Sequence, residues 1–242
     1  MAELVVALDF PTREEALAAA GRLAGQVAWV KVGIELFTAA GPDVVVRLKE
    51  QGFQVFLDLK LFDIPNTVRG AVRAAAGLGA DMVSIHVLGG ERMAEAAREG
   101  RVQGTAAGRR PPLLLGVTLL TSQDLAEAHF FRTSAPGDLV LDLARAARRY
   151  YLDGVVCSGL ELAEVKAACG PGFGCLVPGV RPEGQQVPGD DQRRVVSPAR
   201  AVELGADFLV VGRSITRAVS PADAARTVLG QMRPPKAAEE GR

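Results

Sequence analysis

The sequence predicts an α/β fold in the form of a single (β/α)8 barrel, the TIM barrel, and three observations support this prediction. Eight short runs rich in Val, Leu or Ile alternate with longer segments rich in Ala, Leu and Arg that have helical periodicity. Strict alternation of this kind indicates a parallel sheet covered by helices. The chain has 242 residues, 48% of them hydrophobic, which is enough for one large core, so we expect one domain over residues 1–232.

The eight predicted strands are continuous apolar runs, as expected for strands that are buried on both faces. They are expected at residues 4–9, 27–32, 53–59, 81–87, 113–119, 153–157, 173–177 and 207–212. The helices between them are expected at residues 12–24, 36–51, 66–79, 91–103, 137–151, 160–169, 198–205 and 221–231. Ser197 before Pro198 and Ser220 before Pro221 are suitable N-caps for the last two helices.

The main alternative fold is an open, doubly wound sheet. That fold usually has a glycine-rich G-x-G-x-x-G turn after its first strand, whereas Asp9-Phe10-Pro11-Thr12 follows the first strand here. The barrel is therefore favoured. The polar, proline-containing segment 233–242 is expected to be a disordered and dispensable tail.

Composition and charge argue against several classes of function, including nucleic-acid binding, membrane binding and metal binding. The formal net charge is zero and the pI is 6.8, so nothing in the overall charge indicates binding to nucleic acid or to an anionic membrane. Cys157, Cys169 and Cys175 lack C-x-x-C spacing and are expected to be small apolar fillers in a reducing compartment. His86 and His129 fit no metal-ligand pattern, so we expect no metal and no cofactor. The lack of a signal-like or membrane-spanning segment predicts a cytoplasmic protein.

The third predicted strand ends in Asp58-Leu59-Lys60, and Asp63 follows shortly after it. Residues two apart in an extended strand share a face, so Asp58 and Lys60 are expected to point the same way. Buried charges have to be paired, and a lysine beside carboxylates keeps its proton. A structural ion pair is the alternative, but such a pair often adds little net stability, which favours a functional role. The arrangement predicts a group that holds a proton ready for transfer.

Polar residues also follow most of the other predicted strands, at the end of the barrel where active sites lie. They are Asp9, Lys31, His86, Thr118, Thr121, Arg181 and Arg213. Some have simpler interpretations, since Asp9 could cap a helix and Lys31 could extend to the rim. A lone histidine is more often a satisfied core residue, so His86 is not counted as catalytic.

Two segments late in the chain predict a phosphate site. The loops after strands 7 and 8 of such barrels commonly bind phosphate, where glycine lets the backbone approach and arginine makes bidentate contacts. Gly212-Arg213 is the main candidate, and Arg181 is the second. The stretch from Gly179 to Gln192 is rich in glycine, proline and polar residues and is expected to be a lid, with a disordered insertion as the alternative.

Several motifs together resemble one known family. The run from Asp58 to Thr67 matches the pattern D-x-K-x-x-D-I-x-x-T. Shorter matches follow the same order along the chain, at Ala7-Leu8-Asp9, Lys31-Val32-Gly33, Leu120-Thr121-Ser122, Pro178-Gly179-Val180-Arg181-Pro182, Asp191-Gln192 and Val211-Gly212-Arg213-Ser214-Ile215-Thr216. In these motifs the chain resembles the orotidine 5'-phosphate decarboxylase family over nearly its whole length.

The resemblance implies conversion of orotidine 5'-phosphate (OMP) to UMP and carbon dioxide in de novo pyrimidine biosynthesis, without metal or cofactor. It implies the catalytic residues Lys31, Asp58, Lys60 and Asp63, with Lys60 as the proton donor to C6. The substrate-binding residues that it implies are Asp9, Lys31, Asp58, Asp63, Ile64, Thr67, Thr121, Pro178, Arg181, Gln192, Gly212 and Arg213. It also implies a homodimer, in which Asp63 and Thr67 complete the site of the neighbouring subunit.

Two alternatives remain. Sugar-phosphate enzymes of the same barrel superfamily, such as hexulose-phosphate synthase, share the D-x-K-x-x-D strand but use magnesium and an enediolate. The segment Ile64-Pro65-Asn66-Thr67 after Asp63 resembles the orotidylate family instead. The other alternative is a catalytically silent phosphate-binding or scaffolding barrel, which has no need of Lys60 between Asp58 and Asp63.

Overall fold

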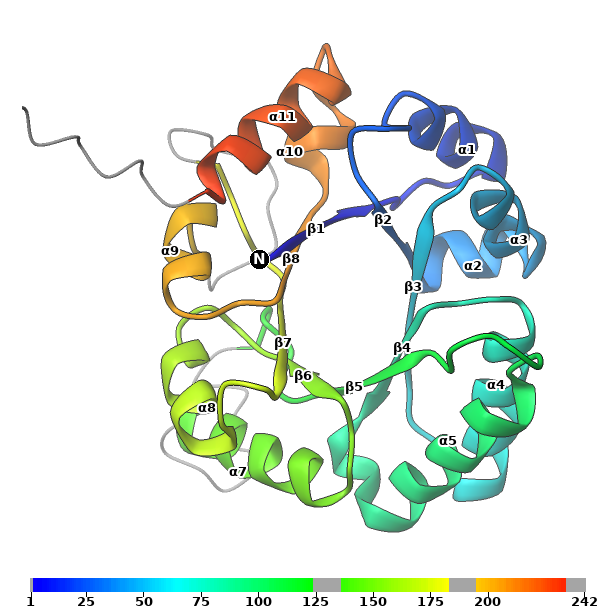
Figure 1. Cartoon of the computed structure of the whole chain (residues 1–242), viewed down its shortest axis with the longest axis vertical. Helices are drawn as coiled ribbons and strands as arrows, with labels where there is room; N and C mark the ends of the chain where they lie inside the picture. The colour runs from blue at the N-terminus through cyan, green and yellow to red at the C-terminus, as the bar shows by residue number, and fades with distance from the viewer. Residues whose placement is uncertain (1, 124–135, 183–194, 234–242) are drawn as a thin grey trace, which may run out of the picture.

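The computed structural model describes residues 2–123, 136–182 and 195–233. Its eight strands are parallel and close into a barrel in chain order, and helices surround the barrel (Figure 1). This confirms the predicted (β/α)8 fold. Among the described helices, none is both long and apolar enough to cross a membrane. Apart from Arg233, the segment predicted to be a tail lies outside the described residues.

The strands are β1 (Glu3–Ala7), β2 (Trp29–Gly33), β3 (Gln54–Leu61), β4 (Met82–His86), β5 (Leu113–Val117), β6 (Gly154–Val156), β7 (Gly174–Val177) and β8 (Phe208–Val211). The helices are α1 (Arg13–Gly21), α2 (Ile34–Ala40), α3 (Asp43–Glu50), α4 (Pro65–Gly77), α5 (Gly90–Gly104), α7 (Pro136–Arg149), α8 (Leu162–Cys169), α9 (Pro198–Glu203), α10 (Arg213–Thr216) and α11 (Pro221–Gln231). A short 3-10 helix, η1 (Val87–Gly89), follows β4.

The predicted N-caps Ser197 of α9 and Ser220 of α11 are confirmed. Ser197 Oγ accepts a hydrogen bond from the Arg200 N–H at 3.3 Å, and Ser220 Oγ accepts one from the Asp223 N–H at 3.4 Å. One helix prediction was wrong. The segment 36–51 forms two helices, α2 and α3, because Gly41 adopts φ 69° and a proline follows it.

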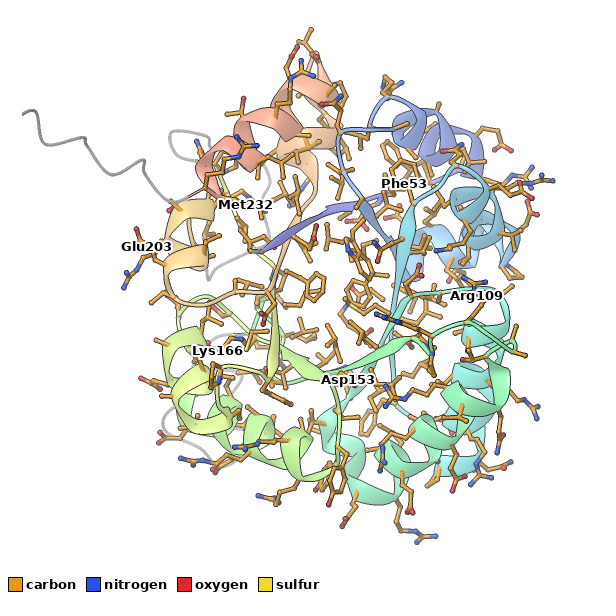
Figure 2. All side chains as sticks on the ribbon, in the orientation of Figure 1. Phe53, Arg109, Asp153, Lys166, Glu203 and Met232 are labelled. Carbon is orange, nitrogen blue, oxygen red and sulfur yellow. The ribbon has the colours of Figure 1, made fainter. Side chains whose placement is uncertain are left out.

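The interior of the barrel has an apolar layer and a polar layer, and side chains fill the space between the ribbons (Figure 2). The apolar layer consists of Val5, Ala7, Trp29, Phe56, Met82, Leu115, Leu176 and Val210. Two residues further along β2, β3 and β4, the same faces carry Lys31, Asp58 and Ser84. The period-two geometry of the strands therefore places charged groups directly above an apolar floor, at the C-terminal end of the barrel.

Three aspartates fix the opposite end of the barrel. Each immediately precedes a strand, and its carboxylate accepts a hydrogen bond from a backbone N–H of the strand before that one and pairs with a cation. The sets are Asp81 with Val55 and Lys49, Asp153 with Leu114 and Arg101, and Asp207 with Cys175 and Lys166. Asp153 and Lys166 are labelled in Figure 2. These contacts stabilise the scaffold at a distance from the polar layer.

Helices α4 and α5 lie side by side (Figure 1) and pack closely because of two glycines. An added Cβ at Gly100 would overlap the backbone oxygen of Arg69, and one at Gly104 would overlap that of Arg73. Helix α4 begins directly after the β3 motif, so this contact fixes the position of the segment that contains Thr67.

Candidate active site

A pocket of about 720 Å³ opens at the C-terminal ends of the strands. A site at this end is what the (β/α)8 fold leads us to expect. The predicted site residues that line the pocket are Asp9, Lys31, Asp58, Lys60, Thr121, Pro178, Arg181, Gly212 and Arg213. They come from the ends of six different strands, and the closed barrel brings them together. Gln192 lies outside the described residues.

Asp58 is the buried centre of the charged cluster. Its Oδ2 lies 2.7 Å from Lys60 Nζ and 3.8 Å from Lys31 Nζ, and its Oδ1 accepts a hydrogen bond of 2.8 Å from Ser84 Oγ. Lys31 Nζ also lies 3.0 Å from Asp9 Oδ1. Acidic and basic groups therefore alternate along one row, Asp9, Lys31, Asp58 and Lys60, so the two buried members, Lys31 and Asp58, are each paired.

The network keeps the central carboxylate ionised. Burial alone raises the pKa of Asp58, but the positive charges of Lys31 and Lys60 and hydrogen bonds from Lys60 and Ser84 outweigh it. The pKa of Asp58 therefore lies below its ordinary value. The ionised Asp58 carboxylate therefore places a negative charge directly beside the Nζ atoms of Lys60 and Lys31.

Lys60 reaches Asp58 by a different backbone route from the one predicted. The expectation of a simple extended strand was wrong, because Lys60 adopts φ 50° and the register between β3 and β4 shifts between Leu57 and Leu61. The left-handed conformation costs roughly 1–2 kcal/mol for a residue other than glycine. The Lys60 N–H donates to Ser84 Oγ at 2.9 Å, so Ser84 holds the bulge in place. Backbone strain of this kind is concentrated at functional sites.

Asp63, Ile64 and Thr67 do not join this pocket within the chain. All three are exposed, and the Asp63 carboxylate accepts a hydrogen bond from the Ile64 N–H at 2.7 Å. Exposed large apolar side chains follow β2, β3 and β4 at this end of the barrel, and we call four of them the apolar rim. They are Ile34, Phe62, Ile64 and Leu88, which are 66%, 61%, 67% and 42% exposed.

The arginine side of the pocket is built on β7 and β8. Arg213 begins α10 immediately after Gly212, and Pro178 and Arg181 follow β7. The described residues Arg181 and Val196 pair with each other, because the Arg181 N–H donates to the Val196 oxygen at 3.0 Å and the Val196 N–H donates to the Gly179 oxygen at 3.3 Å. Residues 183–192 of the predicted lid lie outside the described part of the chain.

Comparison with known proteins now identifies the family. Residues 2–228 match the family model described as "Orotidine 5'-phosphate decarboxylase / HUMPS family". The chain belongs to this family. It is 55% identical over 232 residues to orotidine 5'-phosphate decarboxylase of Maridesulfovibrio salexigens, covering 96% of this chain and 99% of that protein. It is 48% identical to the protein of the same name from Lawsonia intracellularis, over 91% of this chain and 95% of that one.

A solved structure agrees with the family assignment. The crystal structure of orotidine 5'-phosphate decarboxylase from Lactobacillus acidophilus superposes with a TM-score of 0.86 at 36% identity, covering 97% of this chain and 100% of the other. The family resemblance inferred from the strand-end motifs is thereby confirmed.

Sequence reasoning missed several residues at the site. Ser84 binds both members of the central pair, and its position two residues after Met82 on an inward face was the available signal. Glu35 and Arg217 line the mouth of the pocket, and Arg217 stands four residues after Arg213, the spacing of one helical face. Cys157 also lines the pocket, although it is buried as predicted, as are the other two cysteines.

His86 is not the satisfied core histidine that we expected. Its ring is half-buried and packs 5.6 Å from the ring of Phe62, and within the described residues its buried Nδ1 has no hydrogen-bond partner. Burial and the positive charge of Lys60 outweigh the negative charge of Asp58, so the pKa of His86 lies below its ordinary value. His86 does not line the pocket, so nothing in the geometry adds it to the catalytic candidates.

Proposed function

We propose that this protein is an orotidine 5'-phosphate decarboxylase, a carboxy-lyase that converts OMP to UMP and carbon dioxide. The observation that carries the proposal is the Lys60 ammonium held 2.7 Å from a buried, ionised Asp58 inside a pocket whose far side carries arginines. A proton donor at one end and anion-binding groups at the other suit a nucleotide whose reacting carbon is remote from its phosphate. The named relatives support the same reaction.

Lys60 is the proposed proton donor. In the reaction, the bond between C6 of the pyrimidine and its carboxyl carbon breaks, carbon dioxide leaves, and the electron pair stays on C6. A proton from the Lys60 ammonium then forms the new C6–H bond, and the neutral amine regains a proton from solvent. Because the ring delocalises this electron pair poorly, a cation fixed beside C6 before the bond breaks lowers the barrier.

Asp58 and Lys31 have supporting roles in the proposal. Asp58 lies beside the departing carboxylate and holds Lys60 in position by its 2.7 Å contact. Lys31 links Asp58 to the half-exposed Asp9, and we assign Asp9 to the ribose. Thr121, at the opposite wall, is assigned to the pyrimidine ring. Fixed charges of this kind avoid reorganisation during the reaction, which is the largest source of catalysis in many enzymes.

The phosphate is assigned to the β7 and β8 side of the pocket. Gly212 lets the backbone approach, and Arg213 and Arg181 supply planar donors that match a phosphate. Pro178 lines the same wall. We assign Gln192 to the lid that closes over the phosphate, as an inference from the family motif. Binding energy gained at the phosphate can then be used at the reacting carbon.

We further propose that the active form is a homodimer in which Asp63, Ile64 and Thr67 enter the neighbouring subunit's pocket. Two observations support this. These residues are exposed and outside their own chain's pocket, and the apolar rim beside them leaves large side chains in contact with water. An exposed apolar surface next to a site is typical of a protein interface. In this arrangement the partner's Asp63 contacts the ribose hydroxyls, and only a dimer supplies that second carboxylate.

We propose that the reaction needs neither metal nor cofactor, and that it serves de novo pyrimidine biosynthesis in the cytoplasm. The test follows the ultraviolet absorbance of OMP with purified protein in excess EDTA, beside the Lys60→Ala variant. Conversion to UMP by the wild type, with loss of turnover in the variant and an unchanged circular dichroism spectrum, supports the proposal. No conversion under any condition overturns it and favours magnesium-dependent sugar-phosphate chemistry. Near-normal turnover in the Lys60→Ala variant would show that Lys60 is not the proton donor.

A further inference from the structure

We propose that Arg217 is an additional phosphate-binding cation at the mouth of the pocket, which attracts the substrate phosphate and helps to hold it. This inference rests on the proposed function. It begins from the way the charges of the pocket are arranged. Of the described lining residues, those on or shortly after β1, β2 and β3 include three carboxylates and two ammonium groups, whereas those on or shortly after β7 and β8 include three arginines and no carboxylate.

The two sides of the pocket therefore differ in charge, and the side on β7 and β8 is the more positive one. The wall formed by residues on or after β5 and β6, such as Leu119, Thr121 and Val156, has no charged side chain among its described members. A dianionic phosphate entering the pocket is therefore drawn toward the β7 and β8 side. Charges of one sign in a cleft with apolar walls focus the field and raise the local concentration of an oppositely charged ligand.

Arg217 belongs to this side by its position on α10. It follows the last residue of the helix, and its N–H donates to the Arg213 oxygen at 3.1 Å. Residues four apart in a helical turn lie on one face, so Arg213 and Arg217 both reach the same pocket. Arg213 is half-buried at the inner position, and Arg217 is exposed at the outer one.

Arg217 is also available to bind. Within the part of the chain that the structure describes, its guanidinium makes no hydrogen bond or ion pair. Other exposed arginines are engaged, such as Arg200 with Glu203 at 3.1 Å and Arg47 with Glu50 at 3.0 Å. A guanidinium with unused donors beside Arg213 can take up phosphate oxygens that Arg213 leaves uncovered.

The test compares the full-length wild type with Arg217→Gln, Arg217→Lys and the control Arg200→Gln. We expect Arg217→Gln to raise the KM for OMP about 3- to 10-fold with little change in kcat, as for an exposed charge contact, and the difference to shrink at high salt. Arg217→Lys should recover part of the loss. Arg200→Gln should match the wild type, because Arg200 lies outside the pocket.

Orotidine, which lacks the phosphate, decides whether the effect is specific. We expect kcat/KM for orotidine to be equal in the wild type and in Arg217→Gln. Equal loss with OMP and orotidine overturns the inference, since Arg217 would then act on the fold or on the pyrimidine end. An unchanged KM for OMP in Arg217→Gln also overturns the inference about Arg217. The proposed function stands in either case, as long as the wild-type protein converts OMP to UMP.

Equilibrium binding of UMP separates the two proposals if the wild type does not turn over OMP. In that case the proposed function fails, and calorimetric titration with UMP and with inorganic phosphate still tests Arg217. Weaker binding of both by Arg217→Gln than by Arg200→Gln supports a phosphate contact. Identical binding, or no binding by the wild type, counts against it.

Discussion

The Ser84 hydroxyl donates a hydrogen bond of 2.8 Å to Asp58 Oδ1 and thereby ties the fourth strand to the charged centre of the third. The same oxygen accepts the Lys60 N–H at 2.9 Å. Ser84 is fully buried, so water cannot replace either contact. One hydroxyl therefore orients the Asp58 carboxylate and supports the strained backbone of Lys60.

The first prediction concerns Ser84→Ala. The substitution leaves a buried carboxylate oxygen and a backbone N–H without their partner, which costs about 1–3 kcal/mol of unfolding free energy. Because the Lys60 ammonium then moves relative to the substrate, we expect kcat to fall by about 10- to 100-fold. Urea unfolding and steady-state kinetics with OMP measure the two effects.

Ser158→Ala is the matched control for this prediction. Ser158 is as buried as Ser84, and the hydrogen bond that its Oγ makes within the described residues is the one accepted from the Leu160 N–H, at 3.2 Å. We expect it to lower stability without the loss of kcat. Wild-type kcat in Ser84→Ala would show that the hydroxyl does not position the catalytic pair.

The second prediction concerns stability at acid pH. The folded-state pKa of Asp58 lies below the ordinary value of 3.8, so the folded protein binds this proton less readily than the unfolded chain. The stabilisation is fully present above pH 3.8 and is lost as the pH falls through the lower folded-state pKa. We expect the unfolding free energy of the wild type to fall more between pH 5 and pH 3 than that of Asp58→Asn, in parallel urea titrations. Equal slopes would contradict the assignment of a lowered pKa.

Much of the site could be predicted because parallel strands bring their C-terminal ends to one edge. Asp9, Lys31, Asp58 and Lys60 each stand at such an end, and the closed barrel places them in one row. The family motif added Asp63, whose exposed position no strand periodicity could have linked to a site.

Other features of the site and of the fold had only a weak signal in the sequence, or none. Nothing in Leu59-Lys60-Leu61 indicates a positive φ, because the bulge depends on pairing with β4. Ser84 is one small polar residue in an apolar run and resembles a filler. The break between α2 and α3 was readable from Gly41-Pro42, and the continuous helix was an error of interpretation.

The third prediction separates scaffold from site. Asp81 immediately precedes β4 at the end of the barrel opposite the pocket, where its carboxylate accepts a hydrogen bond from the Val55 N–H at 2.7 Å and pairs with Lys49 Nζ at 2.6 Å. We expect Asp81→Ala to lower the unfolding free energy by about 1–3 kcal/mol, because the buried N–H loses its acceptor, with kcat/KM for OMP unchanged. Asp142→Ala, which removes an exposed pair with Arg145, should leave both quantities unchanged. A large loss of kcat/KM in Asp81→Ala would mean that the two ends of the barrel are coupled.

The fourth prediction tests whether Asp63 serves the neighbouring subunit. Lys60→Ala and Asp63→Ala are each expected to be inactive as homodimers. In a mixed dimer, one pocket carries both defects and the other has a native Lys60 and a native partner Asp63. After refolding of an equal mixture, half of the dimers are mixed and one of their two pockets is native, so we expect about a quarter of wild-type activity. Sedimentation velocity establishes the dimer in each sample.

Lys60→Ala mixed with Asp58→Asn is the control, because both residues line the same pocket of one chain. Every pocket in that mixture keeps one defect, so no activity should return. If Asp63 instead acts within its own chain, the Lys60→Ala and Asp63→Ala mixture behaves like the control. Recovery in the first mixture alone therefore requires that Asp63 cross to the partner, since no rearrangement within a chain makes a native pocket from these two variants.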